Sequence, residues 1–203
     1  EAGQYAQAED VGRSALDAQP LDCWAHHAVA HVMEMQARHQ DGIGWMIARE
    51  PFWSGDDNFF QVHNWWHLAL YHLERDETAE VLALFDGPIF GARSGLALDL
   101  VDAAALLWRL HLQGVELGTR WQAVADDWTA LGAAGQYAFN DAHAMMAFVG
   151  AGRVDAAAAV LDAQRQALGG TADNQRFSAE VGLPLCLALQ AFGDGDYRRC
   201  VEL

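Results

Sequence analysis

The sequence predicts an all-α protein whose helical hairpins stack into a right-handed superhelix, an α-solenoid. Three observations support this fold class. Apolar residues recur with helical spacing along most of the 203 residues. Polar residues recur every thirty-eight positions, at Asn64, Asp102 and Asn140, as expected of a structural repeat. No segment shows the alternation of polar and apolar residues between hairpin turns that β-strands require.

The interval between these polar residues is typical of tetratricopeptide-like units, which pair two helices in about 34 to 40 residues. We therefore expect one helical-repeat domain over residues 1–203. The first helix resembles the second helix of such a unit, so we expect the chain to be a fragment of a longer protein. The expected units are 1–20 (partial), 21–51, 58–88, 97–132, 138–169 and 175–203 (partial).

Prolines, glycines and a capping aspartate divide the N-terminal half into helices. Pro20 ends the first helix, and Asp22 is a suitable N-cap for the second. Asp41-Gly42 predicts a turn, Pro51 ends a short helix, and Gly87-Pro88 closes the next hairpin. The expected helices are 3–18, 23–40, 43–49, 62–74 and 78–85, with a loop over 52–58.

Glycines punctuate the C-terminal half in the same way. Gly114 and Gly118 join one helix pair, Gly132–Gln136 is a linker, and Gly150–Gly152 is the turn of the next pair. Pro184 lies inside the last long helix and predicts either a kink or a simple helix boundary. The expected helices are 98–113, 120–131, 139–149, 154–168, 176–192 and one that starts at 197.

Composition excludes some classes of partner. The formal charge of -16 comes from 28 acidic residues against 12 arginines, and such a surface repels nucleic acids and anionic lipids. No apolar run approaches the ~18 residues of a membrane span. The three cysteines, Cys23, Cys186 and Cys200, form no CxxC pair, so we expect buried free thiols and a cytoplasmic location.

Two pairs of histidines predict the functional site. His27 and His31 stand four residues apart, as do His63 and His67, so each pair shares one face of a helix. Together they offer four imidazoles for a divalent transition metal ion, with a carboxylate from Glu34 or Asp102 to orient them. One His-x-x-x-His pair is weak evidence, and neither pair carries the glutamate that marks zincin proteases.

Two alternatives to a metal site stay open. The histidines, with Asn64, Asn140 and tryptophan indoles, form a structural network of hydrogen bonds in the first alternative. In the second, they line a pocket for a small molecule or a peptide and act as hydrogen-bond donors or acid–base groups. A diluted copy of the pattern occurs at Asn140 to His143. Trp65 and Trp66 are expected to pack in the core rather than form a ligand wall.

Five segments together resemble the tetratricopeptide repeat protein 38 family over most of the chain from Asp22 onward. They are HAVAHVMEMQ (27–36), HNWWHLALYHLE (63–74), LVDAAALLWRLHLQGVELGTRW (100–121), FNDAHAMMAFVGA (139–151) and EVGLPLC (180–186). The resemblance implies a tetratricopeptide-like superhelix and, because members are longer, truncation at both ends. It brings no settled reaction.

The resemblance also implies which polar positions belong to the pocket. They are His27, His31, Glu34, His63, Asn64, His67, Asp102, Asn140, Asp141 and His143. Two functions follow: a site for a small molecule or metal ion, with catalysis open, or a scaffold that binds a protein partner. The inner helices lack the basic residues that clamp acidic tails, so a peptide partner would be neutral or basic. The sequence leaves the oligomeric state open.

Overall fold

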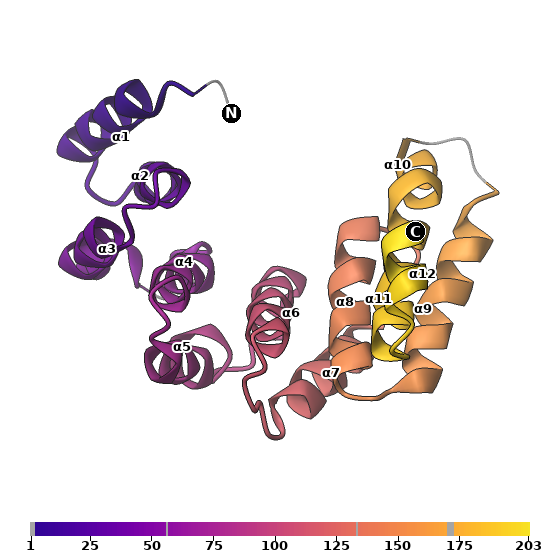
Figure 1. Ribbon diagram of the computed structural model, residues 1–203. Helices are drawn as coiled ribbons and strands as arrows, with labels where there is room; N and C mark the ends of the chain where they lie inside the picture. The colour runs from indigo at the N-terminus through magenta and orange to yellow at the C-terminus, as the bar shows by residue number, and fades with distance from the viewer. Residues whose placement is uncertain (1–2, 56, 133, 170–172) are drawn as a thin grey trace. The chain divides into compact units, whose positions relative to one another are not determined.

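The computed structural model describes residues 3–55, 57–132, 134–169 and 173–203 (Figure 1). These residues form helices and turns without a strand, which confirms the predicted all-α class. Contacts divide the chain into two compact units, Glu1–Ala92 and Arg93–Leu203. The single repeat domain stays a prediction, and parts of the predicted first unit, of the 52–58 loop and of the 132–136 linker lie outside the described residues.

The first unit consists of helices that pack on their neighbours in the sequence. α1 contacts α2, α2 contacts α3, and so on to α5, while α2 also contacts α4. The helices are α1 Tyr5–Ala18, α2 Cys23–Met35, α3 His39–Trp53, α4 Gln61–Leu73, α5 Thr78–Leu84 and the π-helical η1 Phe85–Ile89. The side chain of Asp22 accepts hydrogen bonds from two backbone N–H groups of α2, which confirms it as the N-cap.

The core of this unit fixes α2, α3 and α4 together. Val29, Met33, Met46, Leu68 and Tyr71 are among its buried side chains. The Tyr71 hydroxyl donates a 2.6 Å hydrogen bond to the carbonyl of Ala30, which ties α4 to α2. α2 and α4 are the helices that carry the paired histidines, so this core holds the candidate site in place.

The predicted turn at Asp41-Gly42 is wrong. α2 ends at Met35, and the chain turns at Ala37, which has a positive φ of 54°. α3 then runs from His39 to Trp53 and includes Asp41, Gly42 and Pro51. Pro51 does not end the helix, because it lies in the last turn and Trp53 beyond it is fully buried with its indole N–H bonded to Met46.

The described residues of the second unit form two helical hairpins, which are followed by further helical segments and a short final helix. α6 contacts α7 and α8, α8 contacts α9, and α11 packs on α8, α9 and α12. The elements are α6 Ala97–Leu112, α7 Arg120–Leu131, α8 Ala138–Gly150, α9 Val154–Ala167, α10 Asp173–Phe177, the π-helical η2 Ser178–Gly182, α11 Leu183–Gly193 and α12 Tyr197–Glu202. Gly114, Gly118 and Gly152 have positive φ, in keeping with the predicted turns.

Pro184 lies at a helix boundary, one of the two alternatives that the sequence left open. It occupies the first turn of α11, directly after the π-helical turn η2. The first turn of a helix leaves backbone N–H groups unused, so a residue without one is tolerated there. Within the described ranges, no helix has the length and apolar character needed to cross a bilayer.

Candidate metal centre

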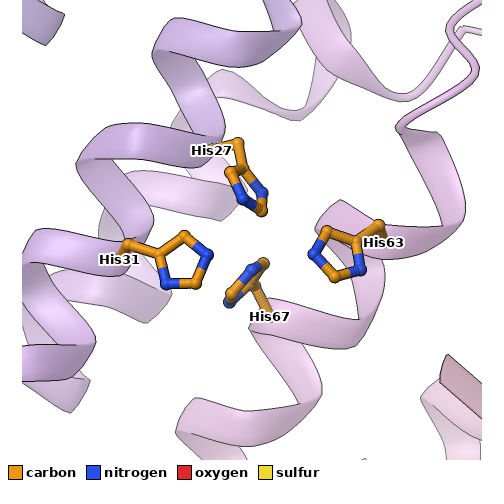
Figure 2. Close-up of side chains that lie close together, drawn as sticks. All are labelled: His27, His31, His63 and His67. Atoms are coloured by element: carbon orange, nitrogen blue, oxygen red, sulfur yellow. The ribbon is translucent and has the colours of Figure 1, made fainter. Parts of the chain in front are cut away.

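The four predicted histidines meet at one point in the first unit. His27 and His31 project from α2, His63 and His67 project from α4, and Figure 2 shows the four rings arranged around a shared centre. One ligand atom from each ring can be chosen so that all four lie within 4.8 Å of one another. Helical spacing aligns each pair, and the contact between α2 and α4 brings together the two pairs that are far apart in the sequence.

The two helices present matching stripes of side chains. Trp24 lies opposite Phe60, with ring centroids 4.4 Å apart. The ring centroids of His27 and His63 are 4.9 Å apart. One helical turn further, the ring centroids of His31 and His67 are 4.4 Å apart. Both stripes have the spacing aromatic-x-x-His-x-x-x-His, and thirty-six residues separate the copies. This repeated motif, with the aromatic residue included, was present in the sequence and was missed there.

Glu34 supports one of the four rings from α2. Its Oε2 lies 3.1 Å from Nδ1 of His67. A carboxylate oxygen accepts hydrogen bonds, so Nδ1–H donates and the lone pair is left on Nε2 of His67. Carboxylates commonly orient metal-binding imidazoles by this contact. The role predicted for Glu34 as an orienting group therefore has the required geometry.

The centre contains buried nitrogen atoms without hydrogen bonds. In the described part of the chain, neither Nδ1 of His27 nor Nε2 of His67 has a hydrogen-bond partner, and both atoms are shielded from solvent. A buried polar group left without a partner costs about 1–3 kcal/mol. A purely structural network would satisfy these atoms. Shielded nitrogen atoms without hydrogen bonds are instead what we expect of imidazoles that are arranged to coordinate an ion.

The electrostatic environment favours the neutral form of three of the rings, the form in which imidazole binds metals. Burial and the three neighbouring imidazoles lower the pKa of His27 to about 2. Burial also holds the pKa of His67 well below its ordinary value. The pKa of His31, whose side chain is only partly covered, is also lowered by partial burial, although the Glu34 carboxylate raises it in part. These three imidazoles need not lose a proton near neutral pH before they bind an ion.

The size of the cluster suits a transition metal ion after a small contraction. Zinc–imidazole bonds of about 2.0–2.1 Å place tetrahedral ligand atoms about 3.3 Å apart. The ligand atoms now lie within 4.8 Å of one another, so the widest pair must approach by about 1.5 Å.

The other predicted pocket residues lie in different surroundings. Asn64 is fully buried on α4, and neither its amide oxygen nor its nitrogen has a hydrogen-bond partner within the described ranges. Asp102 is buried on α6 and Asn140 is half-buried on α8. Because Asn64 belongs to the first unit and the other two to the second, their common groove stays a prediction.

Asp141 and His143 belong to the packing of the second unit. The Asp141 carboxylate accepts hydrogen bonds from the side chain of Gln164 at 3.0 Å and from the backbone N–H of Gly135 at 3.1 Å. Nδ1 of His143 lies 2.7 Å from the carbonyl of Phe139 in the preceding turn. These contacts use the polar groups of both residues within α8, α9 and the loop before α8.

The other histidines and tryptophans of this unit make contacts outside the four-histidine cluster or at its edge. His26 is buried with Nε2 2.8 Å from the carbonyl of Pro20, and His72 pairs with Glu77 at 2.6 Å. Trp66 stacks on His63, so it forms one wall of the cluster as well as part of the packing. More than half of the surface of Trp24 is exposed, although its ring lies against that of Phe60.

Comparison with known proteins does not place the chain in a family. No protein-family model matches it, and no solved structure matches it.

Proposed function

We propose that this chain binds one divalent transition metal ion, such as Zn²⁺, through His27, His31, His63 and His67. The observation that carries the proposal is the convergence of four imidazoles around one point, with two shielded nitrogens that lack hydrogen bonds. Imidazole is a preferred ligand of zinc and of neighbouring transition metals. Glu34 orients His67 and adds negative charge beside the ion.

The experiment measures metal stoichiometry and affinity. Purified protein freed of metal is titrated with Zn²⁺ against a chromogenic chelator, and we expect saturation near one equivalent. The His63→Ala/His67→Ala variant should lose this binding. His39→Ala is a matched control, because His39 begins α3 and no hydrogen bond or ion pair of its side chain is found in the described part of the chain.

A second variant guards against loss of folding. His67 is fully buried, so its replacement also leaves a cavity, whereas His63 is half-buried, and His63→Ala alone should weaken zinc binding with less disturbance of the packing. Circular dichroism checks that each variant remains helical. If wild-type protein takes up no zinc near one equivalent, or if the double variant takes up as much as wild type, the proposed function is wrong.

We further propose that the hairpins are tetratricopeptide-like repeats and that the chain is related to the tetratricopeptide repeat protein 38 family. In support, α2 and α3 have 13 and 15 residues, and the aromatic-x-x-His-x-x-x-His motif recurs after thirty-six residues. We also propose a cytoplasmic location, because Cys23, Cys186 and Cys200 are free thiols. Burial raises the pKa of Cys186 to about 12, as expected of an unreactive thiol.

A further inference from the structure

The four histidine rings of the centre differ in how strongly burial, ring contacts and hydrogen bonds fix their positions. His67 is fully buried and hydrogen-bonded to Glu34. His27 and His63 are half-buried and both contact the ring of Phe60, with centroids 4.9 and 5.3 Å away. Trp66 also stacks on His63 with an interplanar angle of 12°. Packing therefore fixes three of the four rings.

His31 is the exception. Its side chain is exposed, and its ring contacts two members of the cluster itself, His27 and His67, with ring centroids 4.4 Å away in each case. Within the described ranges, the His31 ring has no hydrogen bond or ion pair to another residue. Rotation of His31 away from the centre would break no such bond and would leave its imidazole in water.

Building on the proposed metal site, we infer that the fourth coordination position is exchangeable. His31 occupies this position in the closed form. When His31 swings out, a small monoanion with an oxygen or nitrogen donor, of the carboxylate, azide or hydroxide kind, binds the ion in its place. His27, His63 and His67 hold the ion throughout.

Charge explains why the incoming ligand is an anion. The four imidazoles are neutral ligands, so a divalent ion retains its full charge within its coordination sphere. The aromatic rings of Phe60 and Trp66 beside His27 and His63 lower the local polarity and strengthen electrostatic interactions. An anion in place of His31 offsets one positive charge, which a neutral ligand cannot do. The exposed side of the cluster, where His31 lies, gives it a path from solvent.

The exchange also defines the type of site. A zinc ion with four protein ligands is closed, whereas three histidines and an open position are the arrangement that binds and activates water or a substrate oxygen. Movement of the exposed His31 side chain would convert the centre between the closed form with four histidine ligands and the open form with three. Its ligands are small oxyanions or carboxylates, not a peptide strand that spans several repeats.

The test uses cobalt(II) in the full chain, because the visible absorption of tetrahedral Co²⁺ reports changes of ligand. Protein loaded with one equivalent of Co²⁺ is titrated with sodium azide, and metal content is measured before and after dialysis. We expect a saturable spectral change without loss of cobalt. In His31→Ala the cobalt should remain bound, and azide should bind roughly tenfold more tightly, since no internal ligand competes for the position. His39→Ala should behave like wild type.

The outcomes separate this inference from the metal site itself. If wild-type protein takes up no Co²⁺, the proposed metal function fails. If Co²⁺ binds but azide leaves the spectra of both wild type and His31→Ala unchanged, the metal site stands and the exchange does not. Loss of cobalt from His31→Ala, with helix content unchanged, would likewise show that His31 is an essential ligand and overturn the exchange. The same conclusion follows if azide binds equally to wild type and His31→Ala.

Discussion

Nδ1 of His67 lies 3.1 Å from Oε2 of Glu34, a contact that joins α4 to α2 across thirty-three residues of sequence. The hydrogen bond fixes the ring of His67 and the position of its proton at once, because Nδ1–H donates to the carboxylate. Nε2, the shielded nitrogen without a partner in the described ranges, is thereby left to face the other three imidazoles. This relationship orients the ring of His67 as the proposed metal site requires.

Replacing Glu34 tests this orienting role. We expect Glu34→Ala to weaken zinc binding by roughly 10–100-fold, while all four ligands remain and the stoichiometry stays near one. Glu34→Gln should fall between wild type and Glu34→Ala, because the amide oxygen still accepts a hydrogen bond but carries no charge. The measurement is zinc affinity by chelator competition. Glu74→Gln, an exposed carboxylate at the end of α4, is the control and should leave the affinity unchanged.

Zinc should stabilise the folded protein if the centre binds it. A ligand that binds only the folded state, present at 100 times its dissociation constant, stabilises by about 2.7 kcal/mol. We expect zinc to raise the thermal unfolding temperature of wild type and His39→Ala but not of His63→Ala/His67→Ala. If the histidines form only a hydrogen-bonded network, the double variant would be less stable than wild type, yet zinc would change neither protein.

The pH dependence of stability without metal follows from the neutral imidazoles. Burial lowers the pKa of His27 to about 2 and lowers that of His67 and His31, whereas the unfolded chain titrates near 6.5. Below pH 6.5 the unfolded state therefore binds more protons than the folded state. The contribution of these histidines to the free energy of unfolding should be constant well above this pH and should fall as the solution becomes more acidic.

Chemical denaturation at pH 7.5 and pH 5, with a chelator present, measures this dependence. Acid also acts on other groups, so the informative quantity is the difference between wild type and His27→Asn. Asparagine does not titrate, so the variant should lose less stability than wild type between the two pH values. Equal losses in the two proteins would contradict the buried, neutral state of His27.

The sequence predicted most helices from local helical spacing, and it predicted the convergence of the four histidines from that spacing together with the expected stacking of neighbouring repeats. It did not predict the turn at Ala37, since no glycine or proline marks that position. It misplaced a turn at Asp41-Gly42, where the glycine instead makes room for the ring of Tyr71. The pairing of Glu34 with His67 also depends on how α2 packs on α4, which one sequence does not reveal.

The second unit allows a test of the buried Asp141. Burial raises the pKa of this carboxyl, although hydrogen bonds from Gln164 and Gly135 lower it in part. The folded state thus binds more protons than the unfolded state above the ordinary pKa of 3.8. The protonated Asp141 carboxyl therefore contributes its full stabilisation below pH 3.8. This stabilisation is lost as the pH rises through the raised pKa that Asp141 has in the folded state.

Substitution of Asp141 by asparagine removes this titration. The stability of Asp141→Asn minus that of wild type should therefore increase as the pH is raised from about 3.8 toward neutrality. Urea denaturation at several pH values gives this difference. Asp155→Asn, an exposed residue in the first turn of α9, is the control, and its difference from wild type should stay flat. A flat difference for Asp141→Asn as well would show that the buried carboxyl titrates normally.

Two glycines of α3 separate packing from helix propensity. A Cβ atom built on Gly42 would lie 2.4 Å from the ring of Tyr71, whereas a Cβ atom on Gly44 meets nothing within 4 Å. Alanine normally stabilises a helix interior by about 0.5–1 kcal/mol relative to glycine, so Gly44→Ala should raise stability by about that amount.

Gly42→Ala should instead lower stability by about 1–3 kcal/mol, because the Tyr71 ring is fully buried and hydrogen-bonded to Ala30 and cannot move aside freely. Chemical denaturation measures both, and equal effects would contradict the close packing of α3 on α4. Since α4 carries His63 and His67, Gly42→Ala should also weaken zinc binding, while Gly44→Ala leaves it unchanged.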